Sequence, residues 1–285
     1  MMRRFFYYFI ILIKYMSSEY FSNCIKNNIP FLYCKFGDGE YLCMYKYKSN
    51  DKSLISNCDN DNYTENLSLS LCRSLNYIVN NVKNYYIGEW YQENVKKFFI
   101  SITEKPINYN SYHSFLFDES DLKNNVIRHK LNILKEIKNS KRKKIYVCNN
   151  LLIKSKILLN IDNFVFVSLN NWFDRDYDII MGQIKTLLNG KDDDSIIMTS
   201  CGMGAKVLLA ELYKEYPKCT YIDIGSGLDI ICTKRNSRGW GYKYEELYNK
   251  FLENDFIPDN WNDPKYDYIY PIAHNKLGTH VSKDI

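Results

Sequence analysis

The sequence predicts an α/β protein with a Rossmann-like, mostly parallel sheet flanked by helices. Two observations indicate this fold class. Short runs rich in β-branched and aromatic residues alternate along the chain with helical patterns of apolar residues. Polar or glycine-containing segments follow most of these runs. A strand, a polar loop, a helix and another strand in succession are typical of βαβ units, which build a parallel sheet.

Size and composition agree with one folded domain. The chain has 285 residues, of which 46% are hydrophobic and 16% aromatic, partly because there are 26 tyrosines. A chain of this length buries a sizeable core, and its composition is unlike that of a disordered protein. We expect a single domain over residues 1–285, with a mainly helical insert or subdomain at about 92–141. No repeat or Pro/Gly-rich linker divides the chain.

The first half of the chain contains fewer clear strands than the second. A helix face is visible where Leu67, Leu71, Leu75, Ile78, Val79 and Val82 recur at helical spacing. In chain order we expect a helix capped by Ser17 or Ser18 and ending at residue 26, a strand over 31–36, a loop over 48–64, the helix of that apolar face, a strand over 84–90, and helices over 92–141 with an irregular centre near 106–114.

The second half alternates more regularly between strands and helices. Pro217 ends one strong helical pattern, because proline cannot continue a helix. In chain order we expect strands over 144–148 and 164–168, a helix with the apolar face Ile180, Ile184, Leu187 and Leu188, a strand over 195–199, a helix over 205–216, a strand over 221–224 and a helix over 244–253.

Polar side chains follow five of the predicted strands. Ligands of parallel sheets bind beyond the carboxyl ends of the strands, so we expect these side chains to meet at one edge. In chain order they are Asp38 and Glu40, Asn149 and Asn150, Asn170, Ser200 with Gly202, and Ser226 with Asp229.

Residues 35–40 (KFGDGE) place two carboxylates two positions apart directly after a strand. In an extended segment such residues point to the same side, so Asp38 and Glu40 are expected to converge on one hard cation. Paired oxygen ligands suit Mg²⁺ or Mn²⁺ bound together with substrate phosphates. Gly37 and Gly39 let a ligand approach the backbone. The spacing alone favours the alternative, an ordinary turn with exposed carboxylates.

Two further loops carry possible chemistry. Residues 200–204 (SCGMG) open a helix, whose free N–H groups suit a pyrophosphate, although glycine here also fits simple turn geometry. Asp229 is a candidate general base or hydroxyl acceptor. Arg235 or Arg238 is a candidate for neutralising a diphosphate, the alternative being a solvated basic loop. Trp172 and Trp240 fit either the core or a stacking platform.

Charge and cysteine content exclude several functions. The net charge is +5, but basic residues are spread out except at 138–144, which argues against nucleic-acid binding. Nine cysteines are scattered without a C-x-x-C pair, which argues against a disulfide framework and a zinc site. Reduced cysteines imply a cytoplasmic-type compartment. The four histidines show no metal-ligand spacing, and no Ser-His-Asp arrangement is visible.

The N-terminus begins with an apolar stretch. Residues 5–13 are apolar and follow two arginines. Nine residues are too few to span a bilayer, which takes about 20. We expect a buried strand or helix here, with a peripheral membrane contact as the alternative.

Three motifs together resemble a known family. K-F-G-D-G-E at 35–40, S-C-G-M-G-A-K-V-L-L-A-E-L at 200–212 and Y-I-D-I-G-S-G-L-D at 221–229 look like the GT-D fold glycosyltransferases, first described through a bacterial domain of unknown function. The resemblance covers roughly residues 29–48 and 144–242. It implies a Rossmann-like domain that binds a nucleotide-sugar donor, with the acids of the D-x-E motif, here Asp38 and Glu40, holding Mn²⁺ or a similar cation.

The resemblance also implies a reaction. A sugar passes from a nucleoside-diphosphate sugar, with UDP-sugar as the expected donor, to a hydroxyl of a glycan or glycoprotein. A nucleotidyl- or phosphotransferase and a non-catalytic sugar-binding protein are the alternatives, and the oligomeric state stays open. We expect catalytic roles for Asp229 and Arg238. The expected donor-binding residues are Phe36, Gly37, Gly39, Asn149, Asn150, Asn170, Ser200, Gly202 and Ser226.

Two positions depart from the family pattern. Lys35 replaces the family's arginine, which keeps the charge but loses the planar fork of the guanidinium group. Some members carry Gly-His where this chain has Gly225-Ser226, so no catalytic histidine is assigned.

Overall fold

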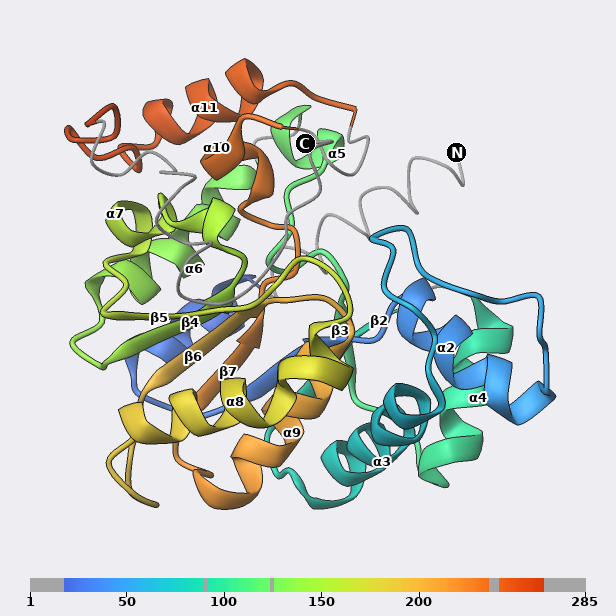
Figure 1. Cartoon of the computed structure of the whole chain (residues 1–285). Helices are drawn as coiled ribbons and strands as arrows, with labels where there is room; N and C mark the ends of the chain where they lie inside the picture. The colour runs from blue at the N-terminus through green and yellow to red at the C-terminus, as the bar shows by residue number, and fades with distance from the viewer. Residues whose placement is uncertain (1–17, 90–91, 124–125, 236–240, 264–285) are drawn as a thin grey trace.

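A parallel sheet of seven strands forms the centre of the described structure (Figure 1). The computed structural model describes residues 18–89, 92–123, 126–235 and 241–263. Every strand pair within these residues is parallel, and the strand order is β3-β2-β1-β7-β6-β4-β5. The strands are β1 (Leu32–Lys35), β2 (Tyr85–Glu89), β3 (Tyr109–Ser111), β4 (Lys144–Cys148), β5 (Asn163–Phe166), β6 (Ile196–Ser200) and β7 (Thr220–Asp223).

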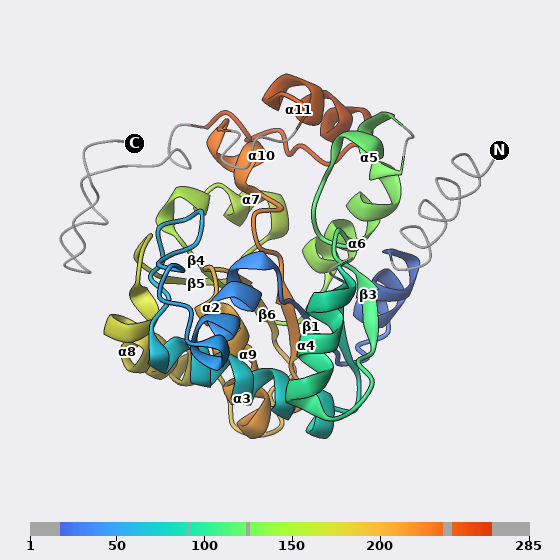
Figure 2. The same ribbon diagram turned by 90° about the vertical axis from the view of Figure 1, so that its right-hand side faces the viewer.

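Helices cover both faces of this sheet (Figures 1 and 2). One face packs against α2 (Asp38–Ser49), α3 (Glu65–Asn81), α4 (Glu93–Thr103), α8 (Trp172–Leu187) and α9 (Gly204–Glu215). The other packs against the helical residues 18–26, α6 (Ile127–Asn139), the short helices η1 (Asn150–Leu152) and α7 (Ser155–Leu159), α10 (Asp229–Thr233) and α11 (Tyr244–Glu253), with α5 (Glu119–Lys123) beside α11.

The strands are apolar on both sides because both faces are covered. In β4, Ile145 and Val147 belong to the core under α8 and α9, while Tyr146 and Cys148 belong to the core under α6 and α7. This alternation follows the two-residue period of a strand. It also explains why the buried strands read as continuous hydrophobic runs in the sequence.

The predicted fold class is confirmed, and the six predicted strands coincide with β1, β2, β4, β5, β6 and β7 to within two residues. The stretch expected to be mainly helical also supplies β3, which pairs with β2 at one side of the sheet. Pro217 follows the end of α9, as expected.

Some sequence predictions fall outside the described residues. The apolar residues 5–13, Arg238, Trp240 and two of the histidines belong to this group. Among the helices of the described ranges, none combines the length and the apolar character that a bilayer crossing requires. All nine cysteines are present as free thiols, and seven of them are buried.

Candidate active site

A cavity of about 450 Å³, here called the charged cavity, opens at the carboxyl ends of β1, β6 and β7. Its lining includes residues from all three strand-end loops and from the segment after α2. The charged side chains among them are five carboxylates and two lysines, so their formal charges sum to −3. They are Asp38, Glu40, Asp59, Asp223, Asp229, Lys35 and Lys206.

Lys206 joins three elements at the floor of the charged cavity. It lies in the first turn of α9, and its Nζ is 2.7 Å from Glu40 Oε1 and 3.1 Å from Asp223 Oδ2. A positive charge in the first turn interacts unfavourably with the helix macrodipole. The two carboxylate partners of Lys206 compensate for this and explain why a lysine lies there. Burial alone would lower the pKa of Lys206, but the carboxylates of Asp223 and Glu40 outweigh it and raise that pKa above its ordinary value.

Asp38 and Glu40 do not lie side by side as expected, because the segment is not extended. Helix α2 begins at Asp38, and residues two apart in a helix are separated by about 200° around its axis. Glu40 turns inward, where its Oε2 accepts the N–H of Gly37 at 2.8 Å and its Oε1 pairs with Lys206. Asp38 is exposed at the mouth of the charged cavity. The two acids therefore have different surroundings.

Asp223 is a site residue that the sequence analysis missed. It ends β7, is 1% exposed, and accepts the backbone N–H groups of Lys35 (3.1 Å) and Gly225 (3.1 Å) besides pairing with Lys206. The signal available in the sequence was an acid inside an otherwise apolar strand, because a buried carboxylate needs partners of its own.

Lys35 is buried beside Asp223 at the end of β1. Its Nζ donates to the carbonyl of Ile224 at 2.9 Å. Burial lowers the pKa of Lys35 to about 8, with Asp223 acting in the opposite direction. Gly225, with φ of +58°, packs directly against the Lys35 ammonium group, so no side chain is accommodated there.

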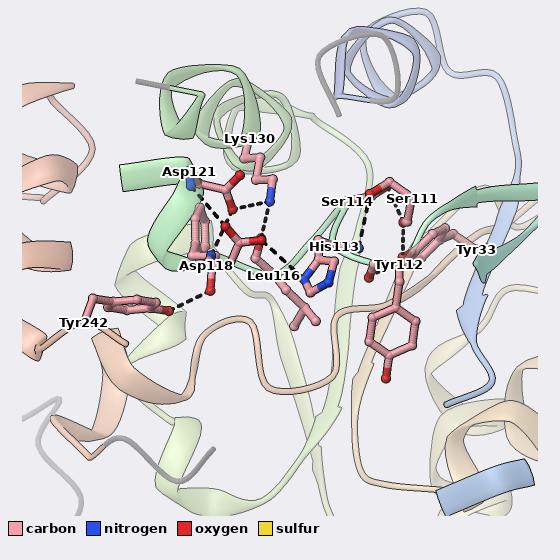
Figure 3. Close-up of polar contacts among 11 residues, drawn as sticks. Tyr33, Ser111, Tyr112, His113, Ser114, Leu116, Asp118, Asp121, Lys130 and Tyr242 are labelled. Atoms are coloured by element: carbon pink, nitrogen blue, oxygen red, sulfur yellow. Dashed lines mark hydrogen bonds and ion pairs between the residues drawn. The ribbon is translucent and has the colours of Figure 1, made fainter. Parts of the chain in front are cut away.

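Tyr112 and Leu116 form one wall of the charged cavity, and the sequence analysis did not single out either residue. The Tyr112 hydroxyl covers Gly37 so closely that a Cβ at that position would lie 2.6 Å from it. Tyr33 donates to the carbonyl of Tyr112 at 3.0 Å, and Lys130 donates to the carbonyl of Leu116 at 2.7 Å (Figure 3). Hydrogen bonds to their backbone carbonyls therefore fix both wall residues in position.

The anchor of this wall is a buried polar network (Figure 3). Lys130 forms an ion pair with Asp121, and both side chains are almost fully buried. Asp121 and Asp118 exchange backbone-to-carboxylate hydrogen bonds of 2.9 and 3.0 Å. Tyr242, from the segment before α11, donates to the carbonyl of Phe117 at 2.8 Å. Charged groups this deep are tolerated because they are paired and hydrogen-bonded.

Most of the other predicted site residues lie at the same edge of the sheet. Gly39, Ser200, Gly202, Ser226 and Asp229 line the charged cavity. Asn149 and Asn170 line a smaller second cavity next to it.

Three of the predicted donor-binding residues, Phe36, Gly37 and Asn150, line neither cavity. The side chain of Phe36 is fully buried in the core against Phe99. Asn150 begins the short helix η1 and lines neither cavity. Trp172 belongs to the core, where its indole N–H donates to the carbonyl of Cys201 at 2.6 Å.

The carboxylates of the charged cavity fit a cation that takes some of its ligands from the protein and the rest from a substrate. Within the described residues, no cluster of three or more His, Cys, Asp or Glu side chains is arranged to hold a metal ion. Mg²⁺ and similar cations are often held by one or two carboxylates and completed by substrate phosphates and water. Asp38 offers such a carboxylate, whereas both oxygens of Glu40 are already hydrogen-bonded or paired.

Comparisons with known proteins find solved structures only. No family model matches the chain, and no curated protein matches it. One similar solved structure is that of the highly conserved domain of unknown function 1792, which has a distinct glycosyltransferase fold. Its TM-score is 0.47 and its sequence identity is 17%, and the match covers 76% of this chain and 84% of that chain. The motifs resemble this same family. A selenomethionine structure of domain 1792 gives a TM-score of 0.46 and 18% identity, with 76% and 83% covered.

Proposed function

We propose that this protein is a metal-dependent glycosyltransferase. It moves a sugar from a nucleoside-diphosphate sugar, with UDP-sugar as the expected donor, to a hydroxyl of a glycan or glycoprotein. The observation that carries this proposal is the formal charge of −3 in a cavity at the ligand-binding edge of a parallel sheet. A diphosphate is repelled from such a cavity unless a divalent cation enters with it.

Asp38 is the protein ligand proposed for that cation, Mn²⁺ or Mg²⁺, with diphosphate oxygens completing the coordination. When bound, the cation supplies Lewis-acid stabilisation of the charge on the leaving diphosphate. Glu40 supports the site by holding Lys206 and by fixing the start of α2 through the N–H of Gly37. It therefore acts as a positioning residue.

Two other charged residues complete the proposed chemistry. Lys35 presents a buried ammonium group at the floor of the charged cavity, where it attracts the diphosphate. Asp229, at the start of α10, is the proposed acceptor of the proton from the attacking hydroxyl. Arg238 stays a prediction for neutralising the diphosphate, since it lies outside the described residues.

Thermal unfolding with Mn²⁺ and UDP tests the proposal. We expect the wild-type protein to be stabilised by the pair of ligands and Asp38→Ala to lose most of this stabilisation, because ligand binding to the folded state raises Tm. Asp192→Ala is the matched control, since the Asp192 side chain is 86% exposed and pairs with Lys218 on the surface. Absence of any shift with UDP, GDP or dTDP in the presence of Mn²⁺ would rule out the proposed function.

Product analysis with labelled donors separates the alternatives. Glycosyl transfer releases a nucleoside diphosphate and leaves the sugar on the acceptor. A nucleotidyl- or phosphotransferase working with the same carboxylates releases different phosphate products. A non-catalytic sugar-binding protein would bind glycan without metal and release no nucleotide.

A further inference from the structure

A cavity of about 460 Å³, here called the basic cavity, lies at the edge of the sheet opposite the charged cavity. Its lining comes from the end of the helical residues 18–26 and the chain just after it, from the end of α6, from the loop that leads into β4, and from Asp194 just before β6. These segments meet at the amino ends of the strands, whereas the charged cavity lies at their carboxyl ends. The proposed function gives the basic cavity no role.

The basic cavity and the charged cavity carry charges of opposite sign. The described residues that line the basic cavity include four cations and two carboxylates, so their formal charges sum to +2. They are Lys26, Lys141, Arg142, Lys143, Glu136 and Asp194. Three of the four cations belong to the basic run at 138–144, the one cluster of basic residues that stands out in the sequence. An anion is therefore attracted to the basic cavity and repelled by the charged one.

Arg142 is the buried cation of the basic cavity, with a side chain that is 4% exposed. Its Nε donates to the carbonyl of Asp194, and its Nη2 donates to Thr220 Oγ1 at 2.8 Å and to the carbonyl of Ser195 at 3.3 Å. Its Nη1 is buried and has no hydrogen-bond partner in the part of the chain that the structure describes. The Asp194 carboxylate is 4.0 Å from Nε and 67% exposed, so it compensates the guanidinium charge only weakly. A bound anion would offset the remaining charge.

The end of α6 does not explain these cations. A helix C-terminus presents unpaired carbonyl groups and attracts positive charge. Lys144, which does not line the basic cavity, meets this need, because its Nζ donates to the carbonyl of Ser140 directly after α6 at 2.8 Å. The four cations of the basic cavity are additional to it.

Two lysines of the basic cavity are available to a ligand. Lys143 is occupied, because its Nζ donates to the carbonyl of Leu187 at 2.6 Å and lies 3.7 Å from Asp193 Oδ2. Lys26 and Lys141 are exposed, and neither forms an ion pair with another described residue. They come from segments far apart in the chain, which the fold brings to one cavity. A ligand there meets two ammonium groups that are not engaged with a carboxylate.

We propose that the basic cavity binds a phosphate group, carried either by a small soluble molecule or by the headgroup of an anionic phospholipid. A phosphate has up to two negative charges and several acceptor oxygens. These match the net charge of +2 and the N–H donors of Lys26, Lys141 and Arg142. Because the basic cavity and the charged cavity lie at opposite edges of the sheet, this site is separate from donor binding and does not depend on the proposed function.

Calorimetric titration with inorganic phosphate in the presence of EDTA tests the proposal. EDTA removes divalent cations, so the charged cavity repels phosphate and does not contribute. We expect the wild-type protein to bind phosphate and the double variant Lys26→Glu/Lys141→Glu to bind it about tenfold more weakly or not at all, because each substitution replaces attraction by repulsion. The matched control is Lys52→Glu/Lys97→Glu, which changes the net charge equally at two exposed lysines outside the basic cavity and should bind as the wild type does.

Sedimentation with vesicles identifies the source of the phosphate. Vesicles of phosphatidylglycerol and phosphatidylcholine are compared with vesicles of phosphatidylcholine alone. If the wild type and the control variant pellet only with the anionic vesicles, and Lys26→Glu/Lys141→Glu stays in solution, the ligand is a lipid headgroup. Binding of inorganic phosphate without sedimentation identifies a soluble phosphate compound.

Two results would overturn the phosphate site. One is that the wild type binds neither inorganic phosphate nor anionic vesicles, and the other is that the control variant weakens binding as much as Lys26→Glu/Lys141→Glu. Stabilisation by Mn²⁺ and UDP reports on the charged cavity instead, and it should be the same in the wild type and in Lys26→Glu/Lys141→Glu, which also shows that this variant is folded. Absence of that stabilisation in the wild type would contradict the proposed function and leave the phosphate site standing.

Discussion

Lys35 and Gly225 face each other between β1 and the loop after β7, and each constrains the other. Gly225 adopts a positive φ of +58°, a conformation that favours glycine. The Lys35 ammonium group occupies the space that a side chain at position 225 would need. A glycine in this loop is thus required both by the backbone and by a charged group of the charged cavity.

Gly225→Ala should therefore destabilise the protein. We expect the free energy of unfolding to fall by about 1–3 kcal/mol, because the left-handed backbone and the crowded ammonium group both oppose a methyl group. Gly182→Ala is the matched control. Gly182 lies within α8 with open space around it, so alanine there should stabilise by about 0.5–1 kcal/mol. Denaturant unfolding of both variants measures the two effects, and equal effects would contradict the steric account.

The charge of Lys35 predicts a pH dependence of donor binding. Burial lowers the pKa of Lys35 to about 8, so the ammonium group is charged below that pH and loses its charge as pH rises through it. We expect the affinity for UDP with Mg²⁺ to fall about tenfold between pH 7 and 9.5, equivalent to ~1.4 kcal/mol. Calorimetric titrations at several pH values measure this affinity.

Lys35→Arg provides the comparison for this prediction. A guanidinium group stays charged over the whole range, so the variant should lose less affinity than the wild type. Ionisation of the ligand affects both proteins equally. The contribution of Lys35 is therefore measured by the difference between the pH dependences of affinity of the wild type and of Lys35→Arg. Identical pH profiles would show that Lys35 does not contribute its charge.

Lys206 connects α9 to the start of α2 and to the end of β7. Its removal leaves the buried carboxylates of Glu40 and Asp223 without the ammonium group that pairs with them. We expect Lys206→Met to lower the free energy of unfolding by about 3–5 kcal/mol, the usual cost of breaking a buried ion pair from one side. Chemical denaturation measures this loss.

The control for Lys206 is a lysine on the surface. Lys218 pairs with Asp192, and both side chains are largely exposed. Lys218→Met should change stability by no more than about 1 kcal/mol, because exposed pairs contribute little. A similarly small effect of Lys206→Met would mean that Glu40 and Asp223 find other partners.

Elements with a strong local pattern were predictable from the sequence, and those defined by distant contacts were not. The apolar strands and the helix face over Leu67–Val79 follow from periodicity alone. β3 has only three residues, Tyr109–Ser111, and no apolar pattern, so only its pairing with β2 reveals it. The start of α2 at Asp38 was missed because glycines on either side of the acid suggested an extended turn.

The candidate site was predictable in position but not in its internal contacts. Parallel-sheet topology gave the correct edge, and most of the predicted polar residues lie there. The Glu40–Lys206–Asp223 cluster joins residues far apart in the chain, and no local pattern signals such pairing. The buried anchor of the Tyr112 wall was missed for the same reason (Figure 3).

Strand β7 lies between β1 and β6, in the centre of the sheet. Leu32 and Tyr33 pair with Tyr221 and Ile222, so the first described strand completes its pairing only with the last one. During synthesis, the segment that contains Asp38 must therefore wait until almost the entire sheet-forming chain has left the ribosome. We therefore expect the charged cavity to assemble late in folding, because long-range contacts are slow to form. A chain shortened before β7 would lack Asp223, Ser226 and Asp229, and with them one side of the charged cavity.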